Sequence, residues 1–110
     1  MLGLYNMKIG IDFIEVSRFR KISEKDHRYW DHVFTAAEWE YAFRDERKFE
    51  HLAGVFALKE AVAKAKGMSG IKNFCDIEIQ FLPGGAPRVE GAEVSISHSQ
   101  EHAVAVAVIV

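Results

Sequence analysis

The sequence predicts a single compact α+β domain in which an antiparallel sheet packs on a long central helix. Three observations predict this fold class: alternating apolar residues near the N-terminus, an apolar helical stretch in the middle, and alternating β-branched residues near the C-terminus. A length of 110 residues suits one domain, here 1–110. Residues 1–6 precede a second methionine, Met7, and we expect them to be an N-terminal extension that adds little.

The central helix is predicted over His51–Gly67, with glycine just past its end. The stretch is apolar on nearly every side, which is typical of a buried helix. It nevertheless carries Lys59, Glu60 and Lys64, and the last two, spaced i and i+4, project from one face. Because buried charge is costly unless it is paired or binds an ion, we expect Glu60 and Lys64 to face a site, although a simple helix pair is the alternative. Lys59 fits a structural salt bridge and a phosphate contact equally well.

A strand is predicted over Lys8–Val16, with alternating apolar residues and one buried face. Asp12 is unusual there, because aspartate is depleted in strands. It is either a solvent-facing position or an anionic ligand for a cation. The next stretch, 17–26, is predicted to be a short helix with Ser17 as its N-cap. Its basic side chains, Arg18 among them, are either a solvated face or a docking surface for an acidic partner.

The second helix has a clear start signal. Thr35 and Glu38 have the spacing of a capping box, and Phe34 and Trp39 that of the matching hydrophobic staple. We expect this helix to continue to about Lys48, with Glu38 among its solvated residues.

After a predicted loop at 68–73, the C-terminal half of the sequence predicts strands. Apolar and polar residues alternate over Phe74–Leu82, as in an antiparallel strand with one solvent-exposed face. A turn rich in glycine and proline then leads to a short return strand at 88–90. A strand that begins at Val94 and a turn at 98–102 follow. Residues 103–110 alternate alanine and valine, which favours a central strand covered on both faces.

Composition and charge argue against several classes of partner and site. The formal charge of −2 gives no global basic field and argues against nucleic acid as the main partner. Cys75 is the only cysteine, so neither a disulfide framework nor a cysteine-based metal site can form within one chain, which fits a cytoplasmic location. The sequence shows no signal-peptide pattern and no membrane-length apolar run, so we expect no membrane partner.

Several motifs, read together and in order, carry a family resemblance. They are GIDFIEVSRF at 10–19, FTAAEWEYA at 34–42, LAGVFALKEAVAKAKG at 52–67, and the closing segments DIEI, GGAPRV and VSISHSQEHAVAVAVI. Together they resemble the 4′-phosphopantetheinyl transferases of the single-domain, holo-acyl-carrier-protein synthase type. The resemblance covers almost the whole chain and implies the fold of that family.

The resemblance implies transfer of 4′-phosphopantetheine from coenzyme A to a serine of an apo acyl carrier protein, with Mg²⁺ as cofactor. Asp12 and Glu60 would be the Mg²⁺ ligands, and Lys64 would contact the phosphates; these three residues would form the catalytic set. Either Glu60 or a metal-bound water would take the serine proton. Arg18 matches a position that touches the acidic carrier protein.

The same resemblance implies how coenzyme A is held. Ser97, His98 and Ser99 lie where the family's closing motif meets the nucleotide, and Pro87 falls on the segment that lines the adenine side. Taken alone, a turn histidine such as His98 is usually only solvated. The family's single-domain members are homotrimers with coenzyme A at the subunit interface, so a homotrimer is expected here.

The sequence also departs from the family. Val55 replaces the usual arginine of the signature helix and Ala86 the usual lysine of the turn, and only Glu90–Glu93 fills a gap that usually holds a helical stretch. Both replacements remove positive charge near a phosphate-rich ligand. The alternative function is therefore a degenerate relative that binds coenzyme A, a nucleotide or a partner protein without turnover.

Overall fold

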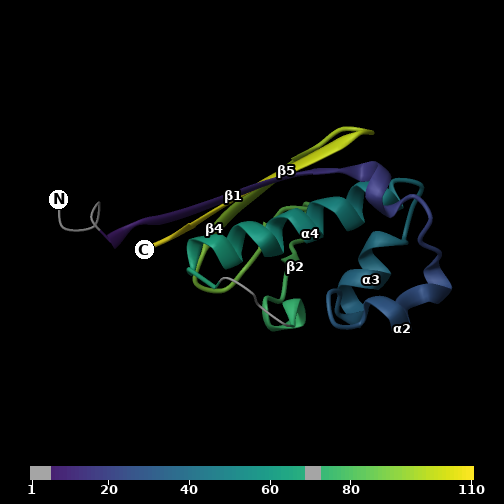
Figure 1. Cartoon of the computed structure of the whole chain (residues 1–110), viewed down its shortest axis with the longest axis horizontal. Coiled ribbons are helices and arrows are strands. Elements are labelled where there is room, and N and C mark those ends of the chain that lie inside the picture. The colour runs from purple at the N-terminus through teal and green to yellow at the C-terminus, as the bar shows by residue number, and fades with distance from the viewer. Residues whose placement is uncertain (1–5, 69–72) are drawn as a thin grey trace.

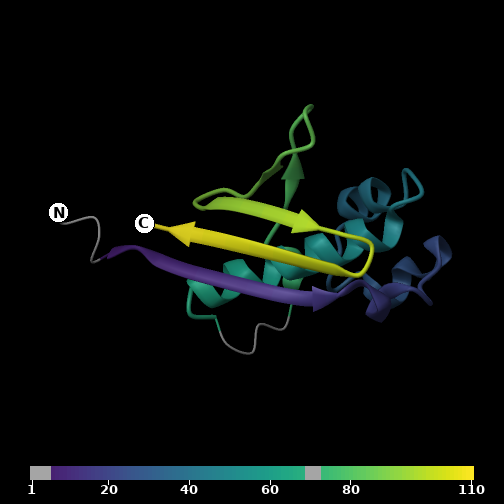
Figure 2. The same cartoon turned by 90° about the horizontal axis from the view of Figure 1, so that it is seen from above.

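The computed structural model describes residues 6–68 and 73–110, and its main sheet has three antiparallel strands (Figure 2). These strands are β1 (Lys8–Glu15), β4 (Glu93–His98) and β5 (His102–Ile109), in the order β1-β5-β4. The central position predicted for the last strand is confirmed. The expected N-terminal extension lies outside the described residues except for Asn6, as does most of the predicted loop at 68–73.

One long helix, α4 (Lys48–Ala65), runs along one face of this sheet (Figure 1). The helix begins at Lys48 rather than at His51. Its end is as predicted: Gly67 has a φ of +69°, and the Met68 amide donates to the Ala63 carbonyl at 2.8 Å. The predicted arrangement of an antiparallel sheet on a central helix is confirmed.

The sheet presents very small residues to α4. Gly10 on β1 lies beside Ala107 on β5, and Ala103, Ala105 and Ala107 are almost completely buried against the helix. Their short side chains let the helix axis approach the strands closely. The buried positions of β1 are therefore Gly10, Asp12 and Ile14, on the face that contains the aspartate.

The opposite face of the sheet is apolar, and no other element of residues 6–68 and 73–110 packs on it. We call it the outer sheet face, and its residues are Ile9, Ile11, Phe13, Val104, Val106 and Val108. Ile9, Ile11 and Phe13 are 60–65% exposed. Among the described residues, α4 is the one layer that packs on the sheet, and it takes the other face. The prediction that β5 is covered on both faces is therefore wrong for this part of the single chain.

The N-terminal helices are shorter than predicted. The stretch 17–26 forms two 3₁₀ turns, η1 (Val16–Phe19) and η2 (Glu24–Asp26). Ser17 lies inside the first turn, so the prediction that it is an N-cap is wrong, and Ser23 is the N-cap of the second turn. A single helical turn, α2 (His27–Trp30), follows.

Helix α3 (Ala36–Ala42) begins with the predicted capping box. The Glu38 amide donates to Thr35 Oγ1 at 3.1 Å, and the Thr35 amide donates to Glu38 Oε1 at 2.9 Å. The rings of Phe34 and Trp39 are in contact, with centroids 5.8 Å apart, as the staple requires. The helix ends at Ala42, before the predicted end at Lys48, and a turn connects it to α4.

The long strand predicted over Phe74–Leu82 is wrong in its extent. A 3₁₀ turn, η3 (Phe74–Asp76), precedes a two-residue strand, β2 (Gln80–Phe81), which pairs with β3 (Pro87–Arg88). The side-chain alternation does exist, since Ile77 and Ile79 are buried. The reason for the short ladder is that part of this backbone bonds to buried side chains instead of a neighbouring strand.

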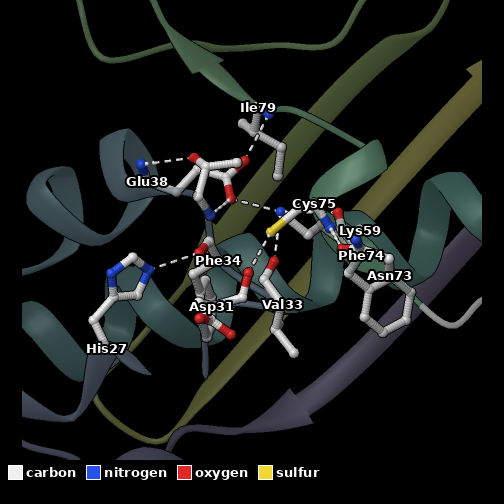
Figure 3. A network of polar contacts seen from close by, with 11 residues as sticks. His27, Asp31, Val33, Phe34, Glu38, Lys59, Asn73, Phe74, Cys75 and Ile79 are labelled. Carbon is white, nitrogen blue, oxygen red and sulfur yellow. Dashed lines mark hydrogen bonds and ion pairs between the residues drawn. The ribbon is translucent and has the colours of Figure 1, made fainter. Parts of the chain in front are cut away.

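Those side chains are Lys59 and Glu38, a completely buried ion pair (Figure 3). The Lys59 ammonium donates to the carbonyls of Val33 at 2.7 Å and Phe74 at 3.0 Å. The second carboxylate oxygen of Glu38 accepts from the Ile79 amide at 2.8 Å. Lys59 therefore has the structural role, and the expectation that Glu38 is solvated is wrong. The pair ties α3, α4 and the 74–79 segment together.

In the described part of the chain, 6–68 and 73–110, no helix has the length and apolar character needed to cross a membrane.

Lys59→Met should strongly destabilise the fold, because it leaves the Glu38 carboxylate buried without its cation. We expect the free energy of unfolding to fall by about 3 to 5 kcal/mol in urea denaturation. The control is Lys66→Met, at an exposed position beyond the end of the same helix, and its effect should stay within about 0.5 kcal/mol. Equal effects of the two substitutions would show that the buried pair does not anchor these segments.

Candidate active site

Strand β1 and helix α4 bring three predicted site residues together. Asp12 points from the inner face of β1 toward α4, with its side chain 17% exposed. The Lys64 ammonium lies 3.1 Å from Asp12 Oδ1 and donates to the Ile11 carbonyl at 3.0 Å. Glu60 interacts electrostatically with both Asp12 and Lys64. We call these three residues the carboxylate–lysine cluster.

The cluster depends on a close approach of two backbones. Gly10 lies two residues before Asp12 on the same face of β1, and a Cβ atom there would be 1.8 Å from the Ala61 carbonyl oxygen and 2.8 Å from the Ala65 amide nitrogen. Both of these are backbone atoms of α4, so they cannot rotate away. Glycine at this position therefore allows Asp12 to lie against the turn of helix that carries Glu60.

The electrostatics of the cluster favour a bound cation. Burial raises the pKa of Glu60, the neighbouring Asp12 carboxylate raises it further, and Lys64 and Arg18 oppose this rise. Two carboxylates that repel each other gain from a divalent cation between them. In the described residues, no group of three or more His, Cys, Asp or Glu side chains could hold a metal ion. A pair of carboxylates nonetheless fits Mg²⁺, which uses one or two carboxylates and takes its other ligands from water and phosphate.

Arg18 lies at the edge of this cluster. It belongs to η1, is exposed, and places its guanidinium 5.5 Å from the centre of the Phe56 ring. It is also near enough to Glu60 to lower the pKa of that carboxyl. The basic residue predicted to meet a partner therefore stands next to the carboxylates.

A separate pocket of about 90 Å³ lies nearer the start of α4. The residues that line it come from α3, α4, β4 and the β2–β3 hairpin: Tyr41, Glu50, His51, Gly54, Val55, Phe81, Gly85, Pro87, Ile96 and His98. Tyr41 and Phe81 form a parallel stack with ring centroids 3.6 Å apart. The pocket thus combines an aromatic wall with a few polar groups, as ligand sites usually do.

Its polar groups form two carboxylate–imidazole pairs. His98 Nδ1 is 2.8 Å from Glu50 Oε1, and His51 Nε2 is 3.0 Å from Asp45 Oδ1. The two imidazole rings meet edge to face with centroids 6.0 Å apart. Burial lowers the pKa of His51, and the hydrogen bond and charge of Asp45 oppose this shift.

Two of the residues predicted to bind coenzyme A line the pocket, and the serines among them lie outside it. His98 and Pro87 line the pocket, whereas Ser97 and Ser99 do not. Ser97 pairs with Val104 of β5 on the outer sheet face. The Ser99 hydroxyl accepts from the amides of Glu101 and His102 and so helps to form the β4–β5 turn.

The pocket residues that sequence reasoning missed are Tyr41, Glu50, His51 and Phe81. One signal was available: Glu50 and His51 are adjacent polar residues at the start of an otherwise apolar helix. Tyr41 and Phe81 gave no such signal, because only tertiary packing brings α3 and β2 together.

Comparison with known proteins assigns the family. The model of the 4′-phosphopantetheinyl transferase superfamily matches residues 8–108. The chain belongs to this superfamily. A holo-[acyl-carrier-protein] synthase from Caldicellulosiruptor bescii is 40% identical over 115 residues, which cover 91% of this chain and 94% of the relative. One from Thermodesulfovibrio yellowstonii is 39% identical over 112 residues, with coverage of 92% and 96%.

Solved structures of the superfamily share the fold. The Bacillus anthracis holo-(acyl-carrier-protein) synthase in complex with CoA (3′,5′-ADP) matches with a TM-score of 0.76 and 36% identity, covering 92% of this chain and 93% of that one. The Helicobacter pylori synthase in complex with coenzyme A matches with a TM-score of 0.77 and 29% identity, covering 90% and 96%. The resemblance and the fold predicted from the sequence are confirmed, and the chain is an enzyme of the holo-[acyl-carrier-protein] synthase type.

Glu60→Gln should stabilise the metal-free protein at neutral pH. Because the folded state raises the pKa of Glu60, folding favours the protonated form, and this contribution is lost as pH rises through the folded pKa. We expect the variant to gain about 0.5 to 1 kcal/mol at pH 7, a modest value because solvent screens the site, and nothing at about pH 4. Thermal unfolding at both pH values measures this difference.

The control is Glu40→Gln, an exposed carboxylate on α3, which should show no such gain. A Glu60→Gln protein that is less stable than the native protein at pH 7 without metal would contradict the repulsion between the two carboxylates.

Proposed function

We propose that this protein transfers the 4′-phosphopantetheine group of coenzyme A to a serine of an apo acyl carrier protein. The observation that carries the proposal is the carboxylate–lysine cluster, in which Asp12, Glu60 and Lys64 come together from β1 and α4. The relatives' names and the coenzyme A complexes of the matching structures support the substrate class.

Mg²⁺ is the proposed cofactor, and Asp12 and Glu60 would hold it. A bound Mg²⁺ would neutralise the negative charge that develops on the pyrophosphate during transfer. The Lys64 ammonium, which two oxygens of β1 already position, would contact the phosphates as a point charge.

The proposed reaction is an attack of the partner's serine oxygen on the β-phosphorus of coenzyme A. A new P–O bond forms to the serine, the P–O bond to the bridging oxygen breaks, and 3′,5′-ADP leaves. The serine proton goes to a base, either the Glu60 carboxylate or a water that the metal would hold. Because the partner supplies the nucleophile, no serine of this chain need act as one.

The pocket is proposed to take the nucleotide end of coenzyme A. Pro87 and the Tyr41–Phe81 stack offer apolar and aromatic contacts for the base, and His98 offers a ring nitrogen to a phosphate. Ser97 and Ser99 would act through the shape of the turn that presents His98. The acidic carrier protein would approach over Arg18, beside the cluster.

A homotrimer with shared sites is proposed, as the family resemblance implies. The outer sheet face leaves three large apolar side chains of β1 exposed, and association would bury them. Glu50 in the pocket and Glu60 in the cluster are ten residues apart on α4, about 15 Å at 1.5 Å per residue. A neighbouring copy that adds its pocket to this cluster would shorten that span.

A single species of monomer mass in sedimentation velocity would contradict the arrangement. The cytoplasmic location stays a prediction.

The direct test is intact mass spectrometry of a purified apo acyl carrier protein after incubation with this protein, coenzyme A and Mg²⁺. We expect the carrier to gain the mass of one phosphopantetheine group. Asp12→Ala should reduce the initial rate at least about a hundredfold, because it removes a proposed metal ligand. EDTA should do the same, because it removes the metal ion itself. The matched control is Asp76→Ala, an exposed aspartate in η3, which should keep the native rate.

The outcome that contradicts the proposal is no mass gain with several carrier proteins from a folded sample that binds coenzyme A. That result would favour the alternative of a relative that binds without turnover, for which Val55 in the pocket lining is the supporting observation. The two functions also differ in thermal stabilisation by coenzyme A. Strong Mg²⁺ dependence that disappears in Glu60→Gln is expected only of the transferase.

A further inference from the structure

The described residues that line the pocket include no permanently positive side chain, although the pocket is proposed to bind phosphate. None of the described residues that line it is a lysine or an arginine. Its acidic group is Glu50, on the first turn of α4. The lining side chains that can become cationic are the two histidines, His51 and His98.

These histidines belong to a continuous row of charged and titratable groups. Arg44 Nε lies 3.8 Å from Asp45 Oδ2, whose other oxygen contacts His51, and His98 contacts Glu50 beyond it. With neutral imidazoles, one guanidinium and two carboxylates give the row a net charge of −1. Protonation of His51 raises the net charge of the row from −1 to 0. The charge near a ligand in the pocket therefore depends on His51.

Charged and titratable groups from several elements surround His51. Its titratable and charged neighbours are Tyr41 from α3, Arg44 and Asp45 from the α3–α4 turn, Glu50 from α4 and His98 from β4. The β2–β3 hairpin brings only Phe81, Gly85 and Pro87, none of which titrates. Burial lowers the pKa of His51 and Asp45 opposes the shift, so the imidazole is mostly neutral at pH 7 and becomes protonated as the pH falls.

We propose that His51, held by Asp45, is a specificity-determining residue that recognises a phosphate monoester on the nucleoside in the pocket. Protonated His51 acts with His98, and together they make the pocket prefer a nucleotide that carries this phosphate over one that lacks it. The preference weakens as His51 loses its proton. The inference rests on the proposed function in one respect: the phosphate would be the 3′-phosphate of coenzyme A. Above neutral pH, coenzyme A and its 3′-dephospho form should then bind almost equally well.

The test compares two small probes that differ only in this group, adenosine 3′,5′-bisphosphate and adenosine 5′-monophosphate. Isothermal titration calorimetry gives the ratio of their dissociation constants between about pH 6 and pH 8. We expect the preference for the bisphosphate to fall about tenfold over this range. The phosphate itself loses its second proton near pH 6, which would strengthen binding to a fixed cation as pH rises. A fall in preference therefore points to the protein.

His51→Gln should remove most of the pH dependence of this ratio. The matched control is His32→Gln, an exposed histidine outside the pocket, which should behave as the native protein does. Asp45→Asn gives a second, independent measurement at a more exposed position. Without its carboxylate, the fall should begin at a lower pH, because Asp45 raises the pKa of His51.

A ratio that stays constant or rises with pH in the native protein would overturn the inference, and so would full pH dependence in His51→Gln. Should His51→Gln fail to fold, an unchanged profile in Asp45→Asn would also overturn it. Because the readout is nucleotide binding, it is separate from turnover. A pH-dependent preference without transfer to any carrier would support this inference and contradict the proposed function. Transfer together with a ratio that does not change with pH would support the proposed function and contradict this inference.

Discussion

The contact between β1 and α4 is the constraint on which the rest of the structure depends. At Gly10 the two backbones are so close that a single methyl group would overlap the Ala61 carbonyl. Such an approach requires a glycine on the strand and small residues across the sheet and along the helix. In return, a carboxylate on a strand and a carboxylate on a helix can face each other, with Lys64 beside them.

This packing also explains why the apolar pattern of β1 faces outward. Apart from Ile14, the inner face is filled by glycine, alanine and Asp12, so the other large side chains of β1 lie on the outer sheet face. A single helix layer covers only one side of a sheet. We propose that another copy of the chain covers the remaining apolar side, and the spacing of about 15 Å along α4 would give such a copy a role in completing the site. The buried Lys59–Glu38 pair holds the other side of α4 to α3 and to the 74–79 segment.

Local sequence signals predicted the features that depend on neighbours in the chain. The capping box at Thr35, the helix end at Gly67 and the alternation of β5 belong to this group, as does the shared face of Glu60 and Lys64. The fold class and the family were predictable because motifs with these local signals occur in one order along the chain.

Features that depend on distant partners were not predictable. The 74–82 segment has the alternation of a long strand, but Lys59 and Glu38, remote in sequence, take part of its backbone hydrogen bonds. The buried face of β1 could not be assigned because the aspartate side, and not the isoleucine side, faces the helix. Likewise, His51 and Glu50 became recognisable as pocket residues only when β4 and the β2–β3 hairpin lay beside them.

We propose that the β1–α4 contact creates a metal site from Asp12 and Glu60. The most direct measurement is a crystal structure with coenzyme A and Mn²⁺, in which anomalous scattering locates the ion. We expect one strong peak about 2.2 Å from a carboxylate oxygen of each residue, with coenzyme A oxygens completing the coordination. A peak that touches only one of the two carboxylates, or coenzyme A bound with Mn²⁺ elsewhere, would contradict it.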